Sequence, residues 1–134
     1  MKKYIFFIVA LFFICCTKNP TWSYDYPIQL FIRVTGSDVG LLFSGTYGNS
    51  SMSIDVEGVV PQKEYNWQIG WVDYPINLED SNDEVFANFK KEQTEGTLIL
   101  KIMQPSSNPD YPYTRKEAST SASYGSVYIS WKQD

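Results

Sequence analysis

The sequence predicts an all-β domain, an immunoglobulin-like β-sandwich of about seven antiparallel strands that follows an N-terminal lipoprotein signal peptide. Apolar residues alternate with polar ones along several short segments, and clusters of glycine, proline, asparagine and serine separate these segments. No stretch shows helical periodicity of useful length. With 134 residues, the chain is long enough for one domain that buries its own core.

The first three predicted strands rest on clear alternation. Residues 28–35 place aliphatic side chains at every second position, namely Ile28, Leu30, Ile32 and Val34. Residues 39–44 and 52–57 continue the pattern with one apolar and one polar face. The stretch 45–49 contains two glycines and an asparagine, and we expect it to connect these two strands as a hairpin.

The remaining predicted strands contain more aromatic residues. Residues 65–71 carry apolar side chains at alternate positions, and we therefore expect Trp67 and Trp71 to point into the core. The alternative is that these two tryptophans share an outward face and form a binding platform. Three more strands are expected over residues 84–91, 98–102 and 127–132, and the stretch 106–115 is predicted as a loop. Seven such strands suffice for two sheets packed about 10 Å apart.

The N-terminus has the pattern of an export signal. Lys2 and Lys3 precede an apolar run over residues 5–14. This run is shorter than the roughly 20 apolar residues that a membrane-spanning helix needs. The pattern therefore favours a signal peptide over a membrane-spanning anchor.

Two adjacent cysteines, Cys15 and Cys16, end this run. Cysteines at this place resemble a bacterial lipoprotein signal, which is cut before a cysteine that carries fatty acids. We expect Cys16 to be the lipidated residue. The predicted organisation is then a signal peptide over residues 1–15, a lipid-anchored tether over residues 16–27 and the β-sandwich over residues 28–134.

The residues around the predicted cut allow one alternative and indicate a location. Phe13, Ile14 and Cys15 precede the cut, whereas the usual pattern has leucine first and a small residue last. A secreted protein cut elsewhere is the alternative, although no A-x-A-like site lies nearby. Thr17 stands where aspartate would retain an enterobacterial lipoprotein at the inner membrane. The expected location is therefore the cell envelope, and the outer membrane in an organism that has one.

Composition excludes several classes of function. The chain has no histidine, which rules out serine–histidine, cysteine–histidine and histidine–metal sites. Its formal net charge is −4 and its basic residues are scattered, with Arg33 and Arg115 as the two arginines, so nucleic acid is not an expected partner. We expect no cofactor.

Chemistry based on carboxylates alone is a weaker candidate. The acidic residues Asp55, Glu57, Asp73 and Glu84 lie in predicted strands or beside them. A glycosidase needs two carboxylates at a defined separation, but spacing in the sequence selects no pair among these residues. Carboxylates on strand surfaces usually face solvent, and we expect the protein not to be an enzyme.

An acidic loop at residues 79–84 offers oxygen ligands of the kind that calcium prefers. Its weak candidate ligands are Asp80, Asn82, Asp83 and Glu84. The loop has Val85 where a calcium-binding EF-hand loop has a glycine, and it lacks the distal bidentate glutamate. An ordinary solvated turn is the favoured interpretation, with no metal bound.

Aromatic residues outside the predicted strands are candidates for binding. Trp22 precedes the first strand, and Tyr111 and Tyr113 flank Pro112 in the loop at 106–115. Exposed rings can stack on sugars or contact a protein partner. The alternative is that they fold back over sheet edges.

Three segments of the chain resemble a known family. Residues 32–36 read IRVTG, residues 96–102 read GTLILKI, and residues 121–127 read SASYGSV. In this order they resemble the mycobacterial small membrane protein (MmpS) family, over roughly residues 28–131. The resemblance implies an immunoglobulin-like β-sandwich on the outer face of a membrane and a role as a transport accessory. The family carries a transmembrane helix, however, where this chain has a lipoprotein signal.

These observations predict a non-enzymatic, lipid-anchored envelope protein whose β-sandwich binds another envelope component. That component is a transporter, for which the protein would be an accessory, or a neighbouring surface protein. The alternative is a surface carbohydrate-binding module that uses exposed aromatic residues. Expected partners are membrane lipid through acylated Cys16 and a protein of the envelope, with carbohydrate as the ligand of the alternative.

Overall fold

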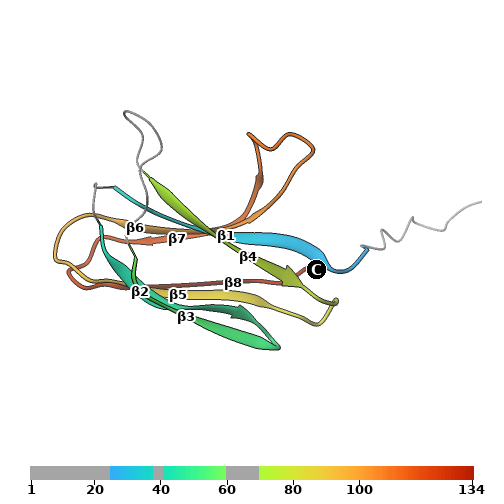
Figure 1. The fold of residues 1–134 in the computed structure, drawn as a ribbon, viewed down its shortest axis with the longest axis horizontal. Helices are drawn as coiled ribbons and strands as arrows, with labels where there is room; N and C mark the ends of the chain where they lie inside the picture. The colour runs from blue at the N-terminus through green and yellow to red at the C-terminus, as the bar shows by residue number, and fades with distance from the viewer. Residues whose placement is uncertain (1–24, 38–40, 60–69) are drawn as a thin grey trace, which may run out of the picture.

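The computed structural model describes residues 25–37, 41–59 and 70–134, and these residues form an all-β sandwich. Eight antiparallel strands in this part of the chain make two four-stranded sheets, which Figure 1 shows as two layers. In chain order the strands are β1 (Ile28–Gly36), β2 (Phe43–Asn49), β3 (Met52–Val59), β4 (Trp71–Leu78), β5 (Val85–Lys91), β6 (Leu98–Gln104), β7 (Tyr113–Thr120) and β8 (Ser126–Trp131). None of the described residues belongs to an apolar helix long enough to cross a bilayer.

The strand order is β4-β1-β6-β7 in the first sheet and β3-β2-β5-β8 in the second sheet. The predicted all-β sandwich is thus confirmed. Strands β1, β3, β5, β6 and β8 overlap the strands predicted from alternation. The differences lie at β2, β4 and β7.

Strand β7 (Tyr113–Thr120) lies mostly within a region that showed no strand pattern. Its sequence, YTRKEAST, has no run of alternating apolar residues, and most of its side chains are exposed. β7 is the edge strand of the first sheet and pairs with β6 alone. An edge strand with solvent on several sides needs few apolar side chains, and the predicted loop at 106–115 therefore extends three residues into β7.

Strand β2 (Phe43–Asn49) includes the stretch 45–49 that was predicted as a hairpin connection. The turn lies at Ser50 and Ser51, after the strand. Gly45 has a φ of 156°, and a Cβ there would lie 2.1 Å from the main-chain oxygen of Asn88. This glycine therefore allows two backbones to approach closely, at a point where the register with β3 shifts.

Strand β4 (Trp71–Leu78) begins where the predicted strand at 65–71 ends, and Trp67 lies outside the described residues. Ile76 and Leu78 are buried, and Trp71 lies at the opposite parity, beside Thr35 on the outer face of the first sheet. The prediction that Trp71 points into the core is therefore wrong. Pro75 lacks an N–H group, and it is tolerated because β4 is an edge strand.

The core consists of the inward side chains of both sheets. β1 and β6 contribute aliphatic side chains that are almost fully buried, and β2 and β5 contribute two aromatic rings. The rings of Phe43 and Phe89 meet edge to face, with centroids 5.3 Å apart. Burial of each such side chain stabilises the fold by about 1.5–3 kcal/mol.

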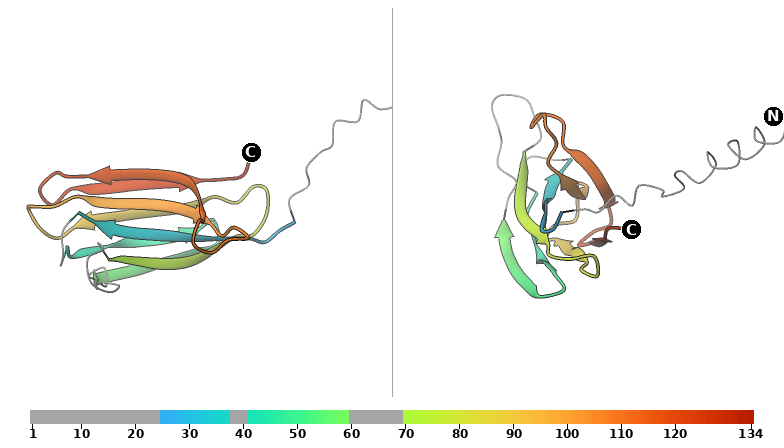
Figure 2. Two further views of the ribbon diagram at one scale, coloured as in Figure 1. Left: turned by 90° about the horizontal axis from the view of Figure 1, so that it is seen from above. Right: turned by 90° about the vertical axis from the view of Figure 1, so that its right-hand side faces the viewer.

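Strand direction divides the loops between two ends of the sandwich. β1 begins at the end where the described chain starts, which we call the tether end. The turn at 50–51, the acidic loop at 79–84, the loop at 105–112 and the C-terminus lie at this end (Figures 1 and 2). The loops at 92–97 and 121–125 lie at the opposite end, the far end.

Lys91 is fully buried at the far end, on the same side of β5 as Val85, Ala87 and Phe89. Its Nζ donates hydrogen bonds to the main-chain oxygens of Thr94 (3.2 Å), Gly96 (2.6 Å) and Ser121 (3.3 Å). These three acceptors match the three N–H donors of an ammonium group. Lys91 thus holds the two far-end loops together.

We expect Lys91→Met to destabilise the domain by about 1–3 kcal/mol, because the substitution removes the ammonium donor from three main-chain oxygens. The exposed neighbour provides the control, since Lys90→Met should change stability by less than about 0.5 kcal/mol. Urea unfolding of the three proteins measures both effects. Equal midpoints for Lys91→Met and wild type would show that these hydrogen bonds contribute nothing.

Candidate functional site

The loop at 105–112 presents the most exposed large hydrophobic side chain among the described residues. Tyr111 is 74% exposed, and Tyr113 at the start of β7 is 58% exposed. Figure 1 shows this loop, in orange, rising from the layer of the first sheet away from the second sheet. Trp22, the third predicted binding residue, lies outside the described residues.

Hydrogen bonds within the loop fix its shape. The Ser106 hydroxyl accepts from the Asn108 N–H (3.1 Å) and donates to the main-chain oxygen of Tyr111 (2.8 Å). The Asn108 side-chain oxygen accepts from the Asp110 N–H at 3.1 Å, and the Asn108 main-chain oxygen accepts from the Tyr111 N–H at 3.1 Å. These bonds hold the backbone of Tyr111 in one position, so little backbone order has to be gained when its ring contacts a partner.

Arg115 connects the base of the loop to the second sheet. Its Nε donates to the Gln104 side-chain oxygen at 2.9 Å. Its guanidinium carbon lies 5.7 Å from the ring centroids of both Tyr113 and Trp131. Cation–π contacts of this kind contribute about 0.5–1 kcal/mol at exposed sites. The Arg115 guanidinium group therefore contacts the rings of both Tyr113 and Trp131.

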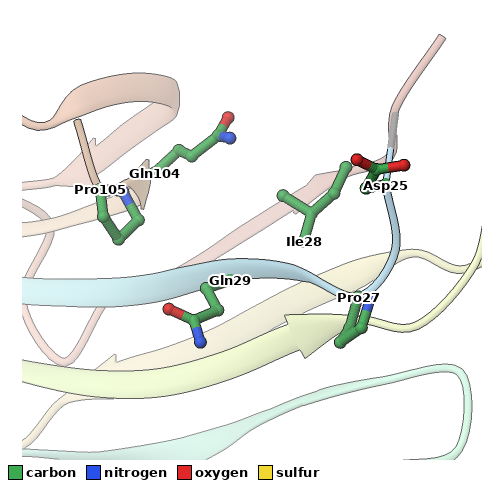
Figure 3. A pocket seen from close by; sticks show the side chains of 6 residues that line it. All are labelled: Asp25, Pro27, Ile28, Gln29, Gln104 and Pro105. Atoms are coloured by element: carbon green, nitrogen blue, oxygen red, sulfur yellow. The ribbon is translucent and has the colours of Figure 1, made fainter. Parts of the chain in front are cut away.

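A hollow of about 290 Å³ lies beside this loop, at the point where the described chain begins. Its lining residues come from the start of β1 and the end of β6, and they are Asp25, Pro27, Ile28, Gln29, Gln104 and Pro105. Figure 3 shows these side chains around an open space between the two segments. Proline rings and side-chain amides line it, which makes it a shallow contact surface with no paired acid and base.

The acidic loop at 79–84 uses its central carboxylate to hold the backbone. Asp83 is 4% exposed, and it accepts hydrogen bonds at 2.9 Å from the N–H groups of Ser50, Glu79 and Glu84. Burial raises the pKa of Asp83, but the hydrogen bonds from these N–H donors and the Ser50 hydroxyl lower the pKa by a larger amount. The resulting pKa lies below the ordinary value of 3.8. Asp83 thus ties the loop to the turn between β2 and β3.

The other three calcium candidates remain at the surface of this loop. Asp80, Asn82 and Glu84 are exposed, and the Asp80 carboxylate accepts from the Asn82 N–H at 2.7 Å. Within the described ranges, no three acidic, histidine or cysteine residues come together in a way that would hold a metal ion. The geometry is that of a turn closed by its own side chains.

The carboxylates considered for catalysis are spread over the molecule. Asp55 and Glu57 are exposed on β3 of the second sheet, and Asp73 lies on β4 of the first sheet. Asp73 is paired with Arg33, and Glu84 lies in the acidic loop at the tether end. The fold thus places Asp73 and Asp55 on opposite outer faces, where they cannot flank one substrate.

The outer face of the first sheet carries a group of side chains that sequence reasoning did not connect. Arg33 donates to both oxygens of Asp73, at 2.8 and 2.7 Å, and its guanidinium carbon lies 4.6 Å from the Trp71 ring centroid. Arg33 and Asp73 are 40 positions apart in the sequence, so only the pairing of β1 with β4 brings them together. The alternation of apolar and polar residues along β1 was the one sequence signal for this group, because it predicts that Arg33 points outward.

Comparisons of the chain with protein-family models, with curated proteins and with solved structures gave no match. The resemblance to the MmpS family therefore stays a prediction. Among the described residues, the two candidate binding surfaces are the tether end, with its loop and hollow, and the outer face of the first sheet.

Asp83 should make stability depend on pH in the acid range. Because its pKa is lower in the folded protein, its stabilising effect is complete above about pH 4 and is lost as the pH falls through the folded pKa. We expect Asp83→Asn to destabilise the domain by about 1–3 kcal/mol at pH 7. The gap to wild type should narrow below about pH 4.

Unfolding free energies at pH 7, 5 and 3 test this expectation. Asp55→Asn is the control, since this carboxylate is exposed on β3 and accepts none of the loop's N–H groups. Its stability should follow that of wild type across the range. A gap in unfolding free energy between wild type and Asp83→Asn that is the same at pH 3 as at pH 7 would contradict the assigned role.

Proposed function

We propose that this protein is a non-enzymatic, lipid-anchored envelope protein whose tether end binds another protein of the envelope. The observation that carries the proposal is the position of Tyr111, the most exposed large hydrophobic side chain among the described residues, on a loop held by its own hydrogen bonds at the end where the chain leads back to Cys16. Tyrosine in such a position supplies contact area at a low entropic cost.

The composition of the tether end supports a protein partner. The Tyr113 ring lies beside Arg115 and the Tyr111 ring is exposed on the neighbouring loop, and aromatic and arginine side chains are enriched where protein interfaces derive most of their affinity. The hollow next to the loop is open and lined by prolines and amides, which suits a convex side chain of a partner. The acidic loop at the same end adds negative charge that favours a partner with basic residues.

The short tether determines where such a partner would lie. Twelve residues, 16–27, separate the expected lipidation site from the first strand, and an extended chain of this length reaches at most about 40 Å. A domain anchored at Cys16 would hold its tether end close to the bilayer. We therefore propose a partner embedded in the membrane or attached to it, such as a transporter, in the outer membrane where the organism has one.

A surface carbohydrate-binding module is the second candidate function. The exposed rings of Tyr111 and Tyr113 favour it, because ring faces of this kind stack on the apolar faces of sugars. The two functions differ in the ligand that these rings bind, which is a protein in the first and a sugar in the second. The crosslinking experiment that follows therefore distinguishes them.

We expect Tyr111→Ala combined with Tyr113→Ala to reduce recovery of a crosslinked envelope protein by about tenfold, because aromatic residues at the centre of an interface carry much of its affinity. The measurement is in-cell crosslinking of the tagged full-length chain, detergent extraction and quantitative mass spectrometry. Tyr128→Ala is the matched control, since Tyr128 is 60% exposed on β8 and lies outside the loop.

Undiminished recovery in the double variant would contradict the proposed surface. Absence of any defined protein partner, together with sugar binding that the double variant loses, would favour the carbohydrate-binding module instead.

Lipidation is tested separately. Cys16→Ala should abolish labelling of the protein by a fatty-acid analogue and leave an uncleaved precursor, because the acylated cysteine is the first residue after the cut. Cys15→Ala is the control and should retain the label. Continued labelling of the Cys16 variant would move the acceptor to Cys15 or refute the cleavage site.

A further inference from the structure

The outer face of the first sheet carries a row of charges that crosses all four strands. Strand register places Asp73 on β4 beside Arg33 on β1, Arg33 beside Lys101 on β6, and Lys101 beside Glu117 on β7. Arg33 and Asp73 approach to 2.7 Å, and Lys101 and Glu117 approach to 2.9 Å. The row therefore has two cations in its centre, a carboxylate at each side and no net charge.

Two aromatic rings lie along this charged row. Phe31 and Trp71 are half-buried on the same outer face, and the Arg33 guanidinium carbon lies 5.3 and 4.6 Å from their ring centroids. Ile99, opposite Thr35 on β6, adds an aliphatic side chain. The face thus combines flat apolar groups with charged side chains in fixed positions.

The charged side chains keep unused hydrogen-bonding capacity. Asp73 engages two of the five N–H donors of the Arg33 guanidinium, and Glu117 engages one of the three donors of Lys101. All four side chains of the row remain accessible, with exposed fractions of 23% for Arg33, 34% for Asp73, 30% for Lys101 and 49% for Glu117. Two central donor side chains and two flanking acceptor side chains therefore span roughly 14 Å, the width of four strands.

We propose that this outer face binds a neutral glycan. A sugar ring has an apolar C–H face that can lie against aromatic groups, and its hydroxyls both donate and accept hydrogen bonds. Phe31 and Trp71 provide the first kind of contact, and the paired charges provide the second. Because the charges of the row cancel, the face offers no excess field to a ligand with strong net charge. Such a site lies apart from the tether end, so the protein partner and the glycan can be bound together.

The test uses the full-length chain in a zwitterionic detergent, because a glycoside detergent would compete for the site. The probes are immobilised oligosaccharides of glucose, mannose and N-acetylglucosamine, with uronic acid oligomers for comparison. We expect wild type to bind at least one neutral oligosaccharide with an affinity that changes little with salt. Trp71→Ala and Asp73→Asn should each weaken this binding by about tenfold.

Two controls keep the test independent of folding and of the proposed function. Tyr128→Ala and Tyr111→Ala should bind the glycan as wild type does, and Asp73→Asn should still recover the crosslinked protein partner. Trp71→Ala removes a half-buried ring and could for that reason disturb the fold. The indole N–H signals of the four tryptophans are therefore also followed by NMR in the unsubstituted chain. The Trp71 signal is identified as the one that is missing in Trp71→Phe. The Trp71 signal should shift with added glycan and that of Trp131 should not.

Three results would overturn the proposal. They are failure to bind any neutral oligosaccharide, unchanged affinity in both Trp71→Ala and Asp73→Asn, and binding restricted to uronic acid oligomers with a steep dependence on salt. Loss of sugar binding in Tyr111→Ala alone would place the sugar at the loop and would also reject the sheet face.

Discussion

The inward faces of the two sheets meet over a continuous layer of aliphatic and aromatic side chains, and the rest of the molecule depends on this contact. Because side chains alternate along a strand, burial of Ile32 and Val34 places Arg33 on the outer face. A shift of one residue in β1 would bury this cation and expose the core residues. The same constraint that stabilises the fold therefore positions the charged row of the first sheet.

Two buried polar side chains hold the ends of this sandwich, and both bind main-chain atoms. Asp83 accepts from N–H groups at the tether end, and Lys91 donates to carbonyl oxygens at the far end. A buried charge is stable only where hydrogen bonds replace its hydration. The loops next to these two residues are therefore fixed in shape. The Tyr111 side chain, in contrast, extends into solvent from a loop whose backbone is held by the Ser106 hydroxyl.

Alternation was sufficient to predict the sandwich and the position of most strands, because the core selects one face of each strand. It failed for β7, whose exposed edge position requires no apolar face, and for Trp71, whose parity is set by Ile76 and Leu78 further along β4. Tyr111 and Tyr113 could be singled out from sequence because aromatic residues in a proline-rich loop are conspicuous. The Arg33–Asp73 pair and the partners of Lys91 could not, since strand pairing and main-chain oxygens leave no mark in the residue pattern.

The edges of the two sheets bear on how copies of this protein behave beside one another. In the proposed lipid-anchored state, copies of the protein would share one membrane surface, where unpaired edge strands of neighbouring domains could join into intermolecular sheets. Pro75 removes a main-chain donor from the middle of β4, while β3 carries Asp55 and Glu57 and β7 carries Arg115, Lys116 and Glu117. Three of the four edge strands in the described sheets therefore carry a feature that disfavours pairing with the edge of another copy.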